Sequence, residues 1–213
     1  MEVLFEDDSV LVVNKPSGIA TQSKGVSSKD LESECKKYRK SKGEEPEIFV
    51  VHRLDQPVSG ILVFAKTKEA AAALTKGINE EDFSKDYRAV VYKEGPIKPG
   101  AKLVDCLIKD GRTNMSCVVP KSTPGAKEAE LVYKVEEENE ETATLQVHLK
   151  TGRHHQIRVQ LSNAGMPLLG DMKYGTEESI AYSKEAGIKQ IGLCACHLEF
   201  KHPKTGGHME FSI

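Results

Sequence analysis

The 213-residue sequence contains no tryptophan, and only 6% of its residues are aromatic. Uninterrupted apolar runs are short, as in Ile61 to Ala65, and are far from the length that crosses a bilayer. The N-terminal segment MEVLFEDDSVLVVNKP carries acids where a signal peptide needs basic residues. A hydrophobic fraction of 38% and a charged fraction of 29% are typical of an ordinary globular protein. We therefore expect a cytoplasmic protein without membrane association.

The cysteines do not form the pattern of a disulfide framework. There are five, an odd number, at the scattered positions 35, 106, 117, 194 and 196. Such usage suits a reducing compartment, and we expect free thiols.

The sequence also lacks an excess of basic charge, because its formal net charge is −2 and its pI is about 6.4. A protein that binds nucleic acid through its overall field is usually basic, so any such binding must use a local patch. The candidates are the stretch 153–158 and a cluster formed by Lys36, Lys37, Arg39, Lys40 and Lys42.

Short apolar segments with turn residues between them predict a protein in which strands outnumber helices. The predicted strands cover residues 10–13, 48–51, 61–66, 87–92, 129–135, 142–149, 191–200 and 208–213. One helix is predicted after a cap at Ser27 or Ser28, and an alanine-rich helix after a cap at Thr67. A third helix is introduced by Gly152 and closed by Gly165. The fold class is therefore α+β.

The segment 52–60, HRLDQPVSG, places an acid, a base and turn residues between two of these apolar runs. Loops on a rigid scaffold are common places for reactive groups. Asp55 and Arg53 can equally stabilise a turn, and this segment alone does not decide between the two interpretations.

Several segments in order resemble the RluA-type RNA pseudouridine synthases. The central one, VHRLDQPVSGILVFAKT, is similar to the family motif HRLDxxTSGxLV. The others are EDDSVLVVNKPSG, KDYRAVV, TGRHHQIRVQLSNAGMPLLGDMKYG, GLCACHLEF and HPKTG. The resemblance implies the pseudouridine synthase fold, a mixed and mostly antiparallel sheet flanked by helices and loops with a central RNA-binding cleft. We expect a single catalytic domain over residues 1–213. The chain opens almost directly at the catalytic-domain strand, so we expect no room for the small RNA-binding S4 domain that many relatives carry in front.

The same resemblance implies an isomerase that converts uridine in RNA to pseudouridine without a cofactor, with Asp55 as the essential carboxylate. Arg158 is the implied ionic partner of Asp55, and Arg153 is a second candidate. Tyr87 matches the tyrosine that stacks on the flipped uracil, although a tyrosine in a strand can also be half-buried packing. Sequence does not decide whether the carboxylate attacks the ribose or the base, or deprotonates the sugar.

The candidate RNA-binding residues are Arg53, His52, Arg153 and Leu193. A planar guanidinium at Arg53 can fill the gap that a flipped nucleotide leaves, and its alternative role is a structural salt bridge. Leu193 resembles the apolar residue beneath the base, with core packing as the alternative.

No metal site is expected, because strand alternation directs the thiols of Cys194 and Cys196 to one face and His197 to the other. The sequence departs from the family pattern at Val58, Cys194 and His154, where Thr, His and Thr or Ser are usual.

The expected partner is structured RNA, ribosomal or transfer, with no DNA, and the protein is expected to be a monomer. One alternative is an inactive RNA-binding protein of the same fold. Another is a hydrolase of nucleosides or glycosides, which typically needs two carboxyl groups flanking the bond that breaks. The sequence offers no second acid in a comparable motif.

Overall fold

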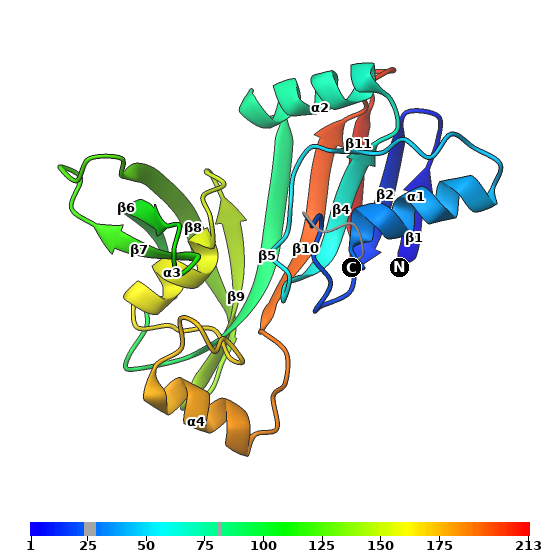
Figure 1. The fold of residues 1–213 in the computed structure, drawn as a ribbon. Coiled ribbons are helices and arrows are strands. Elements are labelled where there is room, and N and C mark those ends of the chain that lie inside the picture. Colours follow the sequence, from blue (N-terminus) through cyan, green and yellow to red (C-terminus); the bar gives the residue numbers. More distant parts are fainter. Residues whose placement is uncertain (24–28, 81) are drawn as a thin grey trace. The chain divides into compact units, whose positions relative to one another are not determined.

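The computed structural model describes residues 1–23, 29–80 and 82–213, and Figure 1 shows its ribbon. The internal contacts divide the chain into two compact units. Unit 1 contains Met1–Lys85 and Cys194–Ile213, and unit 2 contains Asp86–Leu193. Both units combine strands with helices, which confirms the predicted α+β class. The single catalytic domain over residues 1–213 stays a prediction.

The strands of unit 1 form a mixed sheet in the order β1-β2-β4-β10, with β3 paired to β4 and β11 paired to β10. The pairs are antiparallel except β4 with β10, which is parallel. The strands are β1 (Glu2–Glu6), β2 (Val10–Lys15), β3 (Phe49–Val50), β4 (Ser59–Ala65), β10 (Leu193–Lys201) and β11 (His208–Ser212). The two strands predicted near the C-terminus, at 191–200 and 208–213, are confirmed.

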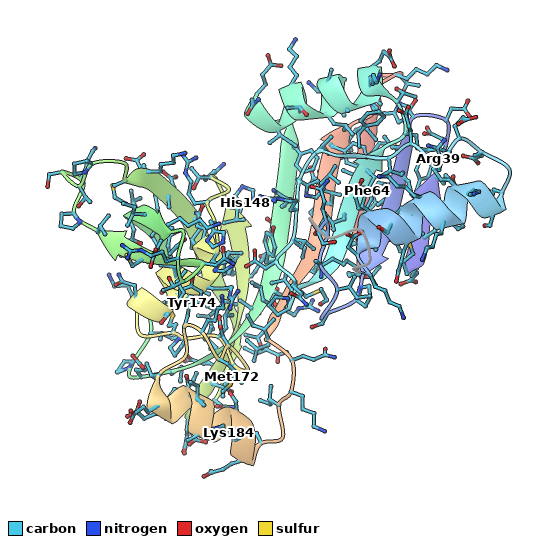
Figure 2. The ribbon with its side chains drawn as sticks, viewed as in Figure 1. Arg39, Phe64, His148, Met172, Tyr174 and Lys184 are labelled. Carbon is cyan, nitrogen blue, oxygen red and sulfur yellow. The ribbon has the colours of Figure 1, made fainter. Side chains whose placement is uncertain are left out.

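Apolar side chains fill both faces at the centre of this sheet. On one face, Val12, Val63 and Phe200 belong to a core that also contains Leu74 from helix α2 (Lys68–Asn79). Phe64, labelled in Figure 2, alternates with Val63 along β4 and is equally buried. Two central strands buried on both sides explain the near-continuous apolar runs in the sequence.

The helices of unit 1 begin at short polar residues that cap their first turns. Thr67 accepts a hydrogen bond from Ala70 N–H at the start of α2, which confirms the predicted cap. Helix α1 (Leu31–Ser41) is capped by Asp30, which accepts from Ser33 N–H over 2.8 Å. The cap predicted at Ser27 or Ser28 was therefore wrong, and both of those serines lie outside the described residues.

Unit 2 contains an antiparallel sheet in the order β5-β9-β8-β6-β7. Its strands are β5 (Phe83–Tyr92), which starts in unit 1, β6 (Gly100–Asp110), β7 (Met115–Val119), β8 (Lys127–Glu138) and β9 (Thr142–Leu149). Strands β8 and β9 were predicted from the sequence, and β6 and β7 were not. Strand β6 was missed because charged residues interrupt its apolar pattern. Leu107 is its only buried residue.

Two helices complete unit 2. Helix α3 (Gln156–Asn163) starts four residues after Gly152, later than predicted. The delay has a local cause, since the Gln156 side chain accepts from Thr151 Oγ1 and Arg153 N–H and so closes a turn ahead of the helix. Helix α4 (Glu177–Glu185) was not predicted, because it buries Ser179 and Ser183 instead of apolar side chains.

All five cysteines are free, as expected. Among the helices in the described parts of the chain, none is long and apolar enough to cross a membrane.

Candidate active site

Asp55 lies on a loop between β3 and β4 of unit 1. The loop closes a turn through a hydrogen bond from Val58 N–H to the Asp55 carbonyl over 3.1 Å. One residue earlier, Leu54 and the Thr21 side chain bond reciprocally. Leu54 N–H donates to Thr21 Oγ1 over 3.1 Å, and this hydroxyl donates to the Leu54 carbonyl over 2.9 Å. The backbone before Asp55 therefore has a fixed position.

The backbone after Asp55 is held by the NKPSG segment. Gly18 N–H donates to the Gln56 carbonyl over 2.9 Å, and the Gln56 side chain returns a bond to the Gly18 carbonyl over 3.0 Å. Ser17 Oγ donates to the Pro57 carbonyl over 2.6 Å. With both flanks fixed, the partly buried Asp55 side chain is presented by a rigid support instead of a free loop.

Lys15 ends β2 and is fully buried beneath this loop. Its ammonium group donates to the carbonyls of Pro16, Ile19 and Gln56 over 3.1, 2.7 and 3.1 Å. Burial lowers the pKa of Lys15 to about 8, and the negative charge of Asp55 opposes that shift. Lys15 thus supplies a positive charge to the loop that carries Asp55.

The two residues before Leu54 differ from each other. Arg53 is exposed, as a residue that contacts RNA must be. His52 is buried, its Nε2 accepts from Val63 N–H over 3.2 Å, and its ring meets Phe83 edge-on. Burial lowers the pKa of His52 well below 6.5, and the charge of Lys85 acts in the same direction. The imidazole therefore packs inside unit 1, and the assignment of His52 to RNA binding stays a prediction.

Unit 2 contains the other four candidate residues, which are Tyr87, Leu193, Arg158 and Arg153. Tyr87 lies on β5, opposite Val147 of β9, and is 5% exposed. Leu193, the first residue of β10, is also 5% exposed. Both are therefore largely enclosed side chains, and their contacts with a flipped base stay predictions.

Arg158 occupies the first half of α3, as predicted, and is buried. Its Nε and Nη2 donate to the two carboxylate oxygens of Asp171, each over 2.7 Å. The expected ion pair of Arg158 with Asp55 stays a prediction. Arg153 is exposed and donates from Nε to the Glu128 carbonyl over 2.8 Å, which leaves its planar group at the surface of unit 2.

The basic cluster predicted on α1 is only partly available to an anion. Arg39, labelled in Figure 2, is buried and donates to Glu44 Oε2 and the Glu47 carbonyl. Lys42 contacts Glu6 over 2.7 Å. Burial alone would raise the pKa of Glu6, but hydrogen bonds from Lys42, Lys66 and Tyr38 lower it to about 2. Arg39 is therefore a structural residue, whereas Lys37 and Lys40 are exposed.

Side chains of metal-ligand type gather at one place in the described residues, on β10 and β11. His197, Glu199 and Glu210 bring ligand atoms within 4.8 Å of one another. His197 Nε2 lies 2.7 Å from Glu199 Oε1. Exposed acidic groups are common without an ion. We assign this group no role in the chemistry considered for Asp55.

Residues 9–163 match the model of a family described as RNA pseudouridylate synthase. The chain belongs to this family. The match contains the loop with Asp55, the strand with Tyr87 and the helix with Arg158. The predicted family is thereby confirmed.

The curated relatives of this chain include two proteins whose names refer to pseudouridine synthases of the large ribosomal subunit. One is Ribosomal large subunit pseudouridine synthase C of Pasteurella multocida, 35% identical over 207 residues, which are 96% of this chain and 61% of that protein. The other is Ribosomal large subunit pseudouridine synthase D of Vibrio cholerae, 31% identical over 219 residues, with 99% and 66% covered. The chain thus spans about two thirds or less of their length.

Solved structures show the same fold. The human protein titled RNA Pseudouridylate Synthase Domain Containing 1 superposes with a TM-score of 0.80 at 21% identity, over 100% of this chain and 82% of that chain. The human protein titled RNA Pseudouridylate Synthase Domain Containing 4 gives a TM-score of 0.78 at 22% identity, over 100% and 87%. The predicted pseudouridine synthase fold is confirmed.

Sequence reasoning missed three residues around the candidate site. Lys15 stands in the NKPSG segment, but a lysine is almost always exposed, so its burial had no signal. Asp171 and Tyr174 stand in the segment GDMKYG, which was noted only as part of the resemblance. The available hint was an Asp and a Tyr three positions apart, enclosed by Gly170 and Gly175.

Proposed function

We propose that the protein is an RNA pseudouridine synthase in which Asp55 is the essential carboxylate. The observation that carries the proposal is the support of this residue. The backbone carbonyls of Leu54, Gln56 and Pro57 all accept hydrogen bonds from the NKPSG segment or from Thr21. An enzyme that uses one carboxylate needs that group held in a fixed direction, and a solvated turn does not need such support.

The proposed reaction is an isomerisation. The N1–C1′ glycosidic bond of a uridine breaks, the uracil turns while it stays bound, and C5 of the base forms a new bond to C1′. The proton on C5 leaves and N1 gains one, so the product has the atoms of the substrate. A carboxylate can assist as a nucleophile or as a base, because it can bond to an electron-poor carbon and leave again.

The roles of the remaining residues are inferred from their type and from the family resemblance, and for Arg53 and Arg153 also from their exposure. Arg53 is exposed and fills the gap in the RNA when the uridine turns out. Tyr87 stacks on the uracil, and Leu193 lies beneath it. Arg158 pairs with Asp55 and orients its carboxylate. Arg153 contacts the RNA backbone with its exposed guanidinium.

Ribosomal RNA of the large subunit is the first substrate to test, because the names of the two curated relatives refer to it. We infer a cytoplasmic enzyme that acts as a monomer, needs no cofactor and has no DNA partner. Transfer RNA is the second substrate class, since structured loops with an accessible uridine occur there too.

The deciding experiment incubates the protein with ribosomal and transfer RNA that lack the modification. Pseudouridines are then mapped by carbodiimide labelling and primer extension. New stops at specific uridines are expected with the unaltered protein. None are expected with Asp55→Asn, which keeps the size of the side chain and removes its charge.

The matched control is Asp8→Asn, the same change at an exposed acid. It should modify the same uridines at the same rate. Melting temperatures of both variants should equal that of the unaltered protein. Modification of no RNA by a folded, unaltered protein would favour the inactive RNA-binding alternative, and release of free uracil would favour a hydrolase.

A further inference from the structure

Arg158 is held by one acid of its own unit in a side-on arrangement. The Nε–Nη2 edge of the guanidinium faces the Asp171 carboxylate, with both hydrogen bonds at 2.7 Å. The two side chains are 6% and 1% exposed. A bidentate pair of this kind fixes direction as well as distance. Two of the five N–H donors of Arg158 are committed to Asp171, so only the other three can serve a further partner.

Asp171 is in turn fixed by a tight turn. Its Oδ1 also accepts from Lys173 N–H over 3.0 Å and from Tyr174 N–H over 3.3 Å. Gly175 N–H donates to the Asp171 carbonyl over 2.9 Å. A side chain at Gly175 would place its Cβ 2.5 Å from that carbonyl oxygen, so the turn requires glycine there. The carboxylate cannot rotate to follow the arginine without breaking the turn.

The ring of Tyr174 lies beneath the guanidinium, with its centroid 5.0 Å from Arg158 Cζ. Figure 2 labels this residue. Its hydroxyl accepts from Ser116 N–H over 2.8 Å and lies 2.7 Å from His155 Nδ1. Its carbonyl accepts from Ser162 Oγ over 2.6 Å. The ring is therefore held at its hydroxyl end and at its backbone.

His155 occupies a special position in this arrangement. It precedes α3 with a φ of 55°, in the left-handed region that few residues other than glycine adopt. Its ring meets Tyr174 edge-on at 5.6 Å and stacks on His154 at 3.7 Å. His155 thus combines a rarely adopted backbone conformation with a contact to Tyr174, the residue beneath Arg158. Such backbone conformations are typical of sites under functional constraint.

We propose that Asp171 is a positioning residue, and that together with the Tyr174 ring it sets the direction in which Arg158 presents its remaining donors to the reaction centre. This inference rests on the proposed function. Asp171, Tyr174 and Arg158 all lie in unit 2. Asp171 also balances much of the charge of the buried Arg158.

A simpler role for Asp171 is to neutralise a buried arginine, and two substitutions separate the two roles. Asp171→Glu keeps the charge but moves the carboxylate by one methylene. Asp171→Asn keeps Oδ1 for the turn, since Asn suits such turns, but directs an amide N–H group at Arg158 Nε. If neutralisation were enough, Asp171→Glu would keep its activity.

The first measurement is kcat and KM on ribosomal RNA. For Asp171→Glu we expect kcat to fall about 10²-fold, as for other misplacements of about 1 Å, with KM for the RNA almost unchanged. Asp171→Asn should show a similar loss. Tyr174→Phe, which keeps the ring and removes the hydroxyl, should retain most of kcat, whereas Tyr174→Leu should not. A kcat of Asp171→Glu within about twofold of the unaltered enzyme would overturn the proposal.

The second measurement does not need activity. In a ¹⁵N spectrum of arginine Nε–H groups, Arg158→Lys identifies the Arg158 signal. That signal should exchange slowly with water in the unaltered protein and in Tyr174→Phe, and fast in Asp171→Asn. If the Asp171 variants fail to fold, the comparison of Tyr174→Leu with Tyr174→Phe tests whether the ring sets the direction of Arg158. A protected Arg158 signal in a protein that modifies no RNA would overturn the proposed function, while intact activity with a lost signal would overturn only the positioning role.

Discussion

The Lys15 ammonium group donates a hydrogen bond to the Gln56 carbonyl over 3.1 Å, so the residue directly after Asp55 is held from the end of strand β2. A neutral amine has two N–H donors for the three carbonyls that the ammonium now serves. The protonation of Lys15 is therefore linked to the geometry of the loop.

Activity should accordingly fall as Lys15 loses its proton, since its pKa is about 8. We expect kcat to decline between about pH 8 and 9, and Lys15→Met to reduce kcat about tenfold at neutral pH and to remove the decline. The measurement is a pH–rate profile of both proteins. A decline that persists unchanged in Lys15→Met would assign it to another group.

Unfolding does not explain such a decline. An unfolded lysine keeps its proton to about pH 10.5, whereas the folded Lys15 loses it near pH 8. Between these values the unfolded state binds more protons, so this group makes the folded state more stable as the pH rises. Melting temperatures recorded along the profile therefore separate the effect on catalysis from loss of structure.

Arg39 should contribute to stability and not to RNA affinity. It is 7% exposed and donates to Glu44 and to the Glu47 carbonyl, so Arg39→Ala removes both hydrogen bonds, although Glu44 keeps its contact with Lys66. We expect the free energy of unfolding to fall by about 2 kcal/mol. Lys40→Ala, on the same helix but exposed, should change it by less than about 0.5 kcal/mol. Urea denaturation measures both, and a loss of RNA affinity specific to folded Arg39→Ala would restore Arg39 to the RNA-binding surface.

The parts of the fold that the sequence predicted well are those in which apolar residues alone decide the structure. Strand β4 is buried on nearly every residue and helix α2 is capped by Thr67, and both stand out as patterns. Helix α4 buries Ser179 and Ser183, where Ser183 Oγ donates to the Ser179 carbonyl and accepts from Gly170 N–H. A helix that buries hydroxyl groups through hydrogen bonds leaves no periodic pattern of apolar residues in the sequence. This helix was therefore missed.

The candidate site shows the same division. Asp55 and Arg158 could be proposed as site residues because their segments resemble a known family, whose short motifs specify the residue type at each position. Their supports were not found. Asp171 lies 13 positions from Arg158, which matches no helix or strand period, and the burial of Lys15 depends on three carbonyls contributed by loops. The burial of His52 was not foreseen because adjacent loop residues need not share exposure, and His52 is buried while Arg53 is exposed.

The burial of His52 should make the protein lose stability in mild acid. Its folded pKa lies well below 6.5, whereas the unfolded residue titrates near 6.5. Below about pH 6.5 the unfolded state therefore binds more protons, and stability falls by up to about 1.4 kcal/mol for each further pH unit. His52→Gln, which offers Val63 N–H another acceptor, should be less stable at pH 7.5 but should lose less between pH 6.5 and 5.5.

Exposed His208 provides the control, because its side chain is 62% exposed. His208→Gln makes the same change at the surface, and its unfolding free energy is measured over the same pH range. Equal slopes in all three proteins would mean that His52 is not the group that titrates.

The parallel pairing of β4 with β10 depends on Gly60. This residue pairs with Ala195 and has a φ of 121°. A Cβ at this position would lie 2.3 Å from the Ala195 carbonyl oxygen, which is backbone and cannot turn aside. Gly60→Ala should therefore lower the free energy of unfolding by about 3 kcal/mol or more, because strain and the clash act together. Gly111→Ala, where nothing lies within 4 Å, should change it by less than about 0.5 kcal/mol. Equal stability of the two variants in urea would show that the strands do not pair in this register.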